Sequence, residues 1–241
     1  KYGKGRGTIL TLKNSFHGRT VTTLSATGQD VFHNYFFPFT DGFRYAEPTM
    51  EGISQVSGHD VCAVMLELVQ GESGVWPLDQ DFVHDLAVLC AERDWLLLVD
   101  EVQTGIGRTG TLFCYQQYGI LPDAVSFAKG IAGGLPFGGF LVNEKCRDVL
   151  GPGTHATTFG GNPVVCAAGR YMLSRLADPD FLAQVARKGE VFRRRLSAMP
   201  HVAEVRGLGM MLGVKLDKGS SREAAEKCLE NGLLILTAKT L

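Results

Sequence analysis

The sequence WLLLVD at residues 95–100 is an apolar run that ends in a carboxylate, and a second run, AVSFA at residues 124–128, ends in Lys129. An uninterrupted apolar run of this length predicts a strand that is buried on both faces of a parallel sheet. In open α/β sheets, ligands bind beyond the carboxyl ends of such strands. The two runs therefore predict that Asp100 and Lys129 lie at one ligand site.

An ionisable group at the end of a buried strand needs a chemical reason to be there, because a lone buried charge costs several kcal/mol. Pyridoxal phosphate (PLP) supplies a reason for both groups. Its aldehyde condenses with a lysine amine, and its pyridine nitrogen stays protonated beside a buried carboxylate. We therefore assign these roles to Lys129 and Asp100.

The neighbouring sequence predicts an α/β fold. Strands are expected at residues 8–13 and 61–66, with further short strands at 124–127 and 139–142. Apolar residues at helical spacing predict a helix over residues 79–93, capped by Asp79, that leads into the strand at 96–99. A strand, a helix and a strand connected in this way indicate a parallel pair in a mainly parallel central sheet.

The pattern changes after residue 176. Asn162-Pro163 begins a helix that runs to about Leu176, and further helices are expected at about 180–199 and after Ser220. A strand pair is expected around residues 202–205 and 210–216. We predict a large PLP-binding domain at residues 1–176, incomplete at its N-terminus, and part of a smaller α+β domain at residues 177–241.

Composition narrows the class of protein. The chain has 241 residues, 45% of them apolar, and a net charge of −1, which argues against a nucleic-acid partner. No apolar stretch is long enough to span a membrane, and residues 1–4 show no signal-peptide core. The six cysteines lack metal-ligand or redox spacing, so we expect no metal, buried thiols in a reducing compartment, and a cytoplasmic location.

Five short motifs occur in order along the chain. They are FHGR at 16–19, QGESG at 70–74, VDEVQTG at 99–105, AKG at 128–130 and TFGGNP at 158–163. With these motifs the chain resembles the class III, PLP-dependent aminotransferases, and most closely the acetylornithine and ornithine aminotransferase group. The resemblance implies the fold of type I PLP-dependent transferases. It also implies that the chain is an internal fragment, lacking the family's phosphate-binding turn and a C-terminal arginine.

The resemblance implies roles around the coenzyme ring. Phe16 and Val102 pack on opposite faces of the ring, and Gln103 hydrogen-bonds near its phenolic oxygen. Asp100 binds the pyridine nitrogen, and Lys129 is the lysine that carries the coenzyme and transfers protons. An aromatic ring suits such a stacking role.

The resemblance also implies substrate and partner contacts. Arg19 grips a substrate carboxylate, for which a planar guanidinium is well suited. Glu72 is typical of members that act on a terminal amine, where it pairs with the C-terminal arginine. Thr158 donates its hydroxyl to the coenzyme phosphate of a neighbouring subunit, which implies a homodimer with shared active sites.

The expected reaction is transamination from the terminal amine of N-acetylornithine to 2-oxoglutarate, giving a semialdehyde and glutamate, as in arginine biosynthesis. Ornithine, succinylornithine and 4-aminobutyrate remain alternative donors. A catalytically silent homologue that serves as a structural or partner-binding subunit is the alternative of another class. The presence of Asp100, Gln103 and Lys129 favours the enzyme, because a silent homologue has no chemical need for a buried lysine.

The stretch GIGRTG at residues 105–110 matches the glycine pattern of a dinucleotide-binding turn. Its context argues against that function. Residues that include two carboxylates separate it from the preceding strand, and residues 111–119 are a poor start for a helix that would bind a pyrophosphate. We therefore reject a nicotinamide-dependent oxidoreductase.

Overall fold

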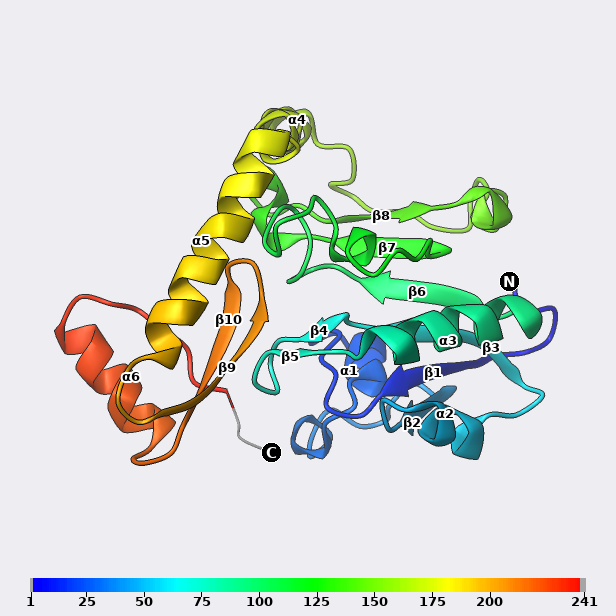
Figure 1. Ribbon diagram of the computed structural model, residues 1–241. Helices are drawn as coiled ribbons and strands as arrows, with labels where there is room; N and C mark the ends of the chain where they lie inside the picture. Colours follow the sequence, from blue (N-terminus) through cyan, green and yellow to red (C-terminus); the bar gives the residue numbers. More distant parts are fainter. Residues whose placement is uncertain (1, 239–241) are drawn as a thin grey trace.

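A six-stranded sheet forms the centre of the computed structural model, which describes residues 2–238 (Figure 1). Its strands lie in the order β2-β1-β3-β6-β7-β8; the first five are parallel, and β8 alone is antiparallel to its neighbour. Their bounds are β1 Thr8–Leu12, β2 Phe43–Ala46, β3 Val61–Leu66, β6 Leu96–Asp100, β7 Ala124–Phe127 and β8 Gly139–Val142. The predicted mainly parallel α/β sheet is confirmed.

Within residues 2–238, two small sheets and six α-helices complete the architecture. The small sheets pair β4 Val69–Gln70 with β5 Trp76–Pro77 and β9 Val202–Leu208 with β10 Met211–Leu216. The helices are α1 Val21–Ala26, α2 Met50–Val56, α3 Gln80–Glu92, α4 Pro163–Leu176, α5 Pro179–Ser197 and α6 Ser221–Glu230. Short 3₁₀ turns are η1 Asp30–Phe32, η2 Cys114–Gln116, η3 Lys129–Ala132 and η4 Glu144–Cys146.

The main core lies between the sheet and helices α2 and α3, which contact each other and pack on β2 and β6 (Figure 1). Helix α3 is amphipathic: Phe82 and Leu86 are buried, while Asp81 is exposed. Its N-terminus is capped as predicted, because the Asp79 side chain accepts from the backbone N–H of Phe82 at 3.0 Å. The apolar face of this helix thus covers the strands that carry the predicted site.

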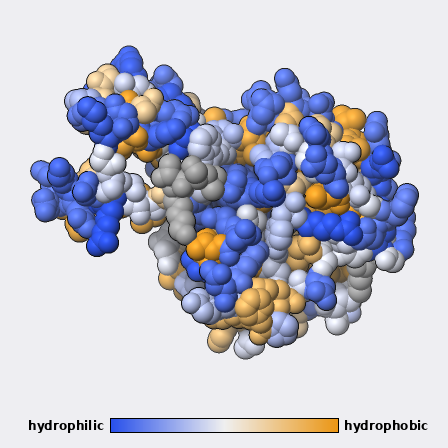
Figure 2. All heavy atoms as spheres, turned by 90° about the horizontal axis from the view of Figure 1, so that it is seen from below, coloured by the Kyte–Doolittle hydropathy of each residue, from blue (hydrophilic) through white to orange (hydrophobic). Residues whose placement is uncertain are grey.

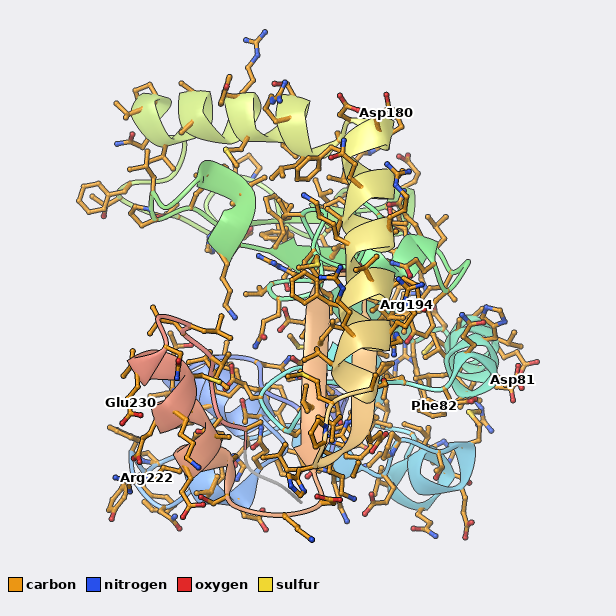
Figure 3. The ribbon with its side chains drawn as sticks, turned by 60° about the vertical axis from the view of Figure 1, so that its left-hand side comes forward. Asp81, Phe82, Asp180, Arg194, Arg222 and Glu230 are labelled. Carbon is orange, nitrogen blue, oxygen red and sulfur yellow. The ribbon has the colours of Figure 1, made fainter. Side chains whose placement is uncertain are left out.

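Predicted cap residues also fix the helices near the C-terminus. Asn162 accepts from the first N–H groups of α4, and Ser220 and Glu223 form the expected capping box of α6. Figure 3 shows Asp180 near the beginning and Arg194 near the end of α5, the charge order that a helix dipole favours. Local sequence signals therefore account for where these helices begin.

Helix α5 packs on the β9–β10 hairpin. Arg193 of α5 is half-buried and donates to the carbonyls of Val205 and Gly207 in β9, so it ties the helix to the hairpin. The β9–β10 sheet and α6 lie to the left of the central sheet in Figure 1. The domain boundary near residue 176 stays a prediction.

The cysteines are only partly as expected. All six are free, but Cys62, Cys166 and Cys228 are half-buried, so the prediction of six buried thiols was wrong for these three. Figure 2 shows a face on which hydrophilic residues predominate and apolar residues form separate patches. Across residues 2–238, none of the helices combines the length and the apolar character needed to cross a membrane.

A close backbone approach at Gly189 yields a prediction for the α5 packing. A Cβ atom at this buried position would lie 2.1 Å from the carbonyl oxygen of Gly209, a backbone atom that cannot rotate away. Gly189→Ala should therefore lower the free energy of unfolding by about 1–3 kcal/mol, although alanine favours a helix. Urea unfolding measures the change, with the exposed Gln184→Ala as control; an equal or higher stability of Gly189→Ala would contradict this packing.

Candidate active site

The candidate site is built by loops that follow four neighbouring parallel strands. Strands β1, β3, β6 and β7 are adjacent in the sheet and point the same way, so their carboxyl ends meet along one edge. Phe16 and His17 follow β1, Glu67 follows β3, Asp100 ends β6 and Lys129 follows β7. The adjacency of the Asp100 and Lys129 strands, expected from their apolar runs, is therefore present.

Asp100 is buried and surrounded by hydrogen-bonding groups. Its Oδ1 accepts from the backbone N–H of Val102 at 3.0 Å and from Ser126 Oγ at 3.1 Å. Its Oδ2 lies 2.9 Å from Nδ1 of the buried His17, whose Nε2 has no hydrogen-bond partner within the described chain. The carboxylate is thus fixed by groups from β6, β7 and the loop after β1.

Lys129 differs from the expectation of a buried lysine. Its side chain is exposed in the single chain, although the residue lies just two positions beyond the end of β7 and begins η3. Its φ of 47° lies in the left-handed region, which is costly for a residue with a side chain and is found most often at functional sites. The apolar run correctly predicted the strand, but the chain turns sharply outward where the run ends.

Phe16 and Arg19 lie together after β1. The Arg19 guanidinium carbon lies 5.5 Å from the centre of the Phe16 ring and 4.6 Å from that of Phe32, and the two rings meet edge to face. These cation–π contacts hold an exposed arginine beside the half-buried aromatic ring. The structure thus brings together the residues predicted to bind a coenzyme ring and a substrate carboxylate.

Glu72 and Gln103 are also brought together, across 31 positions of sequence. Gln103 Nε2 donates to Glu72 Oε1 at 3.0 Å. Glu72 is exposed and lies in the turn between β4 and β5, where a Cβ atom on Gly71 would meet Gln103 Oε1 at 2.4 Å. A larger residue at position 71 would therefore displace the Gln103 side chain from its present position.

The contacts described above do not define the roles of two predicted residues, Val102 and Thr158. Val102 is half-buried and contributes its backbone N–H to Asp100, while the predicted packing of its side chain on a ring stays a prediction. Thr158 lies in an exposed segment, and its contact with a neighbouring subunit also stays a prediction. The single chain brings together the other predicted residues around the β1, β3, β6 and β7 ends.

Sequence reasoning assigned no role to Glu67, which is only 3% exposed. Its Oε2 accepts from the backbone N–H of Phe16 at 2.8 Å. Burial, more than any other effect, raises the pKa of the Glu67 carboxyl group to about 8. The signal that could have identified it is its place directly after the β3 run, as Asp100 ends the β6 run.

His17 was quoted in the FHGR motif without a role, yet it contacts Asp100. A second buried carboxylate, Glu101, accepts from Tyr115 N–H at 2.8 Å and from the Thr104 hydroxyl, and burial raises its pKa. These bonds hold the turns at residues 102–109, so the glycine pattern at 105–110 begins no helix. The rejection of a dinucleotide-binding turn agrees with this geometry.

The donor set around Asp100 fits a pyridine coenzyme. The carboxylate is buried and fixed in orientation, and a lysine follows the neighbouring strand. A phenylalanine and a valine flank this edge from the β1 and β6 loops. Such a set could hold a protonated ring nitrogen and present an amine to a carbonyl carbon. The fold and these residues together are those of the PLP-dependent transferase fold class.

Comparison with known proteins identifies the family. The model of the aminotransferase class-III family matches residues 1–240. The chain belongs to the class III aminotransferases. It is 50% identical over 243 aligned positions to the acetylornithine aminotransferase of Haemophilus ducreyi, and the match covers 100% of this chain and 62% of that protein.

Solved structures show the same fold. An ornithine aminotransferase from Toxoplasma gondii superimposes with a TM-score of 0.90 at 31% identity, covering 96% of this chain and 57% of that one. The N-acetylornithine aminotransferase of Stenotrophomonas maltophilia gives a TM-score of 0.78 at 34% identity, covering 98% and 58%. The chain spans about 60% of the length of the relatives that it matches.

The raised pKa of Glu67 predicts a dependence of stability on pH. The pKa is 4.5 for an ordinary glutamate and about 8 in the folded chain. The folded chain therefore binds this proton more tightly, so the contribution of Glu67 to stability is full below about pH 4.5 and is lost as the pH rises through about 8. Because the Glu67→Gln side chain does not titrate, the Tm of this variant relative to wild type should rise from about pH 5 to about pH 8.5.

Thermal unfolding at the two pH values measures this change. The exposed Glu92 offers a matched control, because Glu92→Gln removes the same group outside the site and should keep a constant Tm difference from wild type. A constant difference for Glu67→Gln as well would show that the Glu67 pKa is not raised in the folded chain.

Proposed function

We propose that the protein containing these residues is a PLP-dependent aminotransferase. It moves the terminal amino group of N-acetylornithine to 2-oxoglutarate, giving a semialdehyde and glutamate. The observation that carries this proposal is the buried Asp100 carboxylate, oriented by Val102, Ser126 and His17 at the edge where Lys129 follows the neighbouring strand. The names of the matched relatives support acetylornithine as the donor.

Asp100 and Lys129 perform the central proton chemistry in this proposal. PLP, when bound, supplies an electron sink for charge that develops on the substrate carbon. Asp100 holds the proton on the pyridine nitrogen, and its three contacts keep it from rotating away. The Lys129 amine takes a proton from the carbon that bears the substrate amino group, acting first as general base and then as general acid. The exposure of Lys129 leaves its amine accessible to substrate.

The remaining residues bind and orient. Phe16 and Val102 would hold the ring by packing on it, and Gln103 would hydrogen-bond near its phenolic oxygen. Arg19, already held over Phe16, binds a substrate carboxylate. The hydrogen bond between Gln103 and Glu72 supports this proposal, in which Glu72 senses the terminal amine and Gln103 binds the coenzyme.

The proposal extends to assembly and to the choice of donor. Thr158 would contact the coenzyme phosphate of a second subunit, so a homodimer with shared active sites is part of the proposal, as is a cytoplasmic location. Ornithine is the alternative donor with a specific observation in its favour, since an ornithine aminotransferase superimposes with a TM-score of 0.90. A TM-score reports backbone similarity and not the donor, so donor screening of the intact protein separates the two.

Replacing the lysine is the first test of this function. Lys129→Ala should lower kcat by at least about 10²–10⁴-fold, because the general base is lost. Mass spectrometry after borohydride treatment should find a pyridoxyl adduct at Lys129 in the wild type and at no residue in the variant. The exposed Lys188→Ala serves as control and should retain both activity and adduct. Near-normal turnover by Lys129→Ala would exclude this assignment.

Glu72 provides the test of donor class. Glu72→Ala should reduce the preference for N-acetylornithine over glutamate by roughly ten- to a hundredfold, because a hydrogen bond to a charged group contributes about 1.5–3 kcal/mol. The ratio of kcat/KM for the two donors measures this preference. Glu51→Ala, an exposed glutamate on α2, is the matched control. An unchanged ratio in Glu72→Ala would remove Glu72 from donor selection.

A further inference from the structure

Glu67 is a buried carboxyl group for which the proposed reaction has no use. It follows β3, whose neighbours in the sheet are β1 and β6, so it lies between the loops that leave those strands. Its Oε2 accepts from Phe16 N–H at 2.8 Å, and Glu67 itself belongs to the segment that leads from β3 into the turn between β4 and β5. One hydrogen bond of this side chain therefore joins two segments that are distant in sequence.

These two segments both carry predicted site residues. Phe16 belongs to the loop after β1, and Gly71 directly precedes Glu72 in the turn between β4 and β5. A second bond joins the same two segments, because Gln70 Nε2 donates to the Lys13 carbonyl at 2.8 Å. The Glu67 contact is thus part of a built connection between the loops.

The electrostatic surroundings of Glu67 make this arrangement costly. The charged groups that act on it are Asp100 and Glu72, and both raise its pKa, as burial does. A buried carboxyl group in such a place is retained only where its hydrogen bonds matter. The Glu67 carboxyl group presents an acceptor oxygen to the N–H of Phe16, whereas the amide in Glu67→Gln could turn its own N–H₂ toward that donor.

We propose that Glu67 is a positioning residue that holds the Phe16 loop and the Glu72 turn in a fixed relation to each other. It acts on the coenzyme ring through Phe16 and on donor selection through Glu72, without touching either ligand. The consequences for catalysis rest on the proposed function. The connection between the loops rests on the hydrogen bonds alone.

Hydrogen exchange tests the connection without coenzyme or substrate. In the intact, coenzyme-free protein, Glu67→Gln should speed exchange roughly tenfold in peptides covering both residues 14–19 and 69–75, because one acceptor is lost. Glu67→Asp keeps the carboxyl group but is shorter by one methylene group, so it should also free both peptides. Glu92→Gln should change neither. Faster exchange in only one of the two peptides, or in neither, would overturn the proposal. If Glu67→Gln does not fold, the exchange rates of Glu67→Asp decide the question.

A kinetic measurement tests the consequence for catalysis. In the PLP-loaded protein, Glu67→Gln should shift the coenzyme absorption band and lower the kcat/KM ratio of N-acetylornithine to glutamate. A wild-type spectrum and ratio in a variant whose loops exchange faster would overturn the positioning role. If the wild type itself transfers no amino group, the proposed function fails, and the exchange result still decides whether Glu67 joins the loops.

Discussion

The Asp100 carboxylate is the constraint on which the arrangement of this edge depends. A buried carboxylate is tolerated only where donors surround it, and here the donors come from the turn after β6, from β7 and from the loop after β1. His17 lies 83 positions from Asp100 in the sequence, so this contact forms only when β1 and β6 lie close together and parallel in the sheet. The hydrogen bonds of the Asp100 side chain thus fix three segments of the chain relative to one another.

The sheet order explains why the functional groups gather here. Because β1, β3, β6 and β7 are parallel and adjacent, each strand delivers its following residue to the same edge. The turn between β4 and β5 then brings Glu72 to Gln103, and the glycine at position 71 permits the close approach. Secondary structure therefore supplies the coarse position of each group, and hydrogen bonds between loops supply the orientation.

Sequence reasoning predicted the elements that carry strong local signals. The apolar run of β6 and the caps Asp79, Asn162 and Ser220 are local, and the structure places strand and helix ends beside them. Sequence reasoning did not predict α1, β2 or α2. The two helices have only six and seven residues. Strand β2 has four residues, is half-buried for most of its length and lies at the edge of the sheet. Such short edge elements are specified by their neighbours more than by their own periodicity.

In the site as well, residues with a local sequence signal were predicted, whereas those that depend on distant neighbours were not. Asp100 and Lys129 were found because each ends an apolar run, but a run says nothing of what covers the residue beyond it, and Lys129 is exposed. Glu67 ends such a run as well and was passed over, because its partners lie in loops whose positions only the folded chain reveals. A carboxylate at the end of a strand is therefore a signal of a site, while its partners decide its role. Asp100 is held by side chains of two other segments as well as by a backbone N–H, and this suits it to bind a coenzyme. Glu67 binds the backbone N–H of a distant loop, and this suits it to hold that loop.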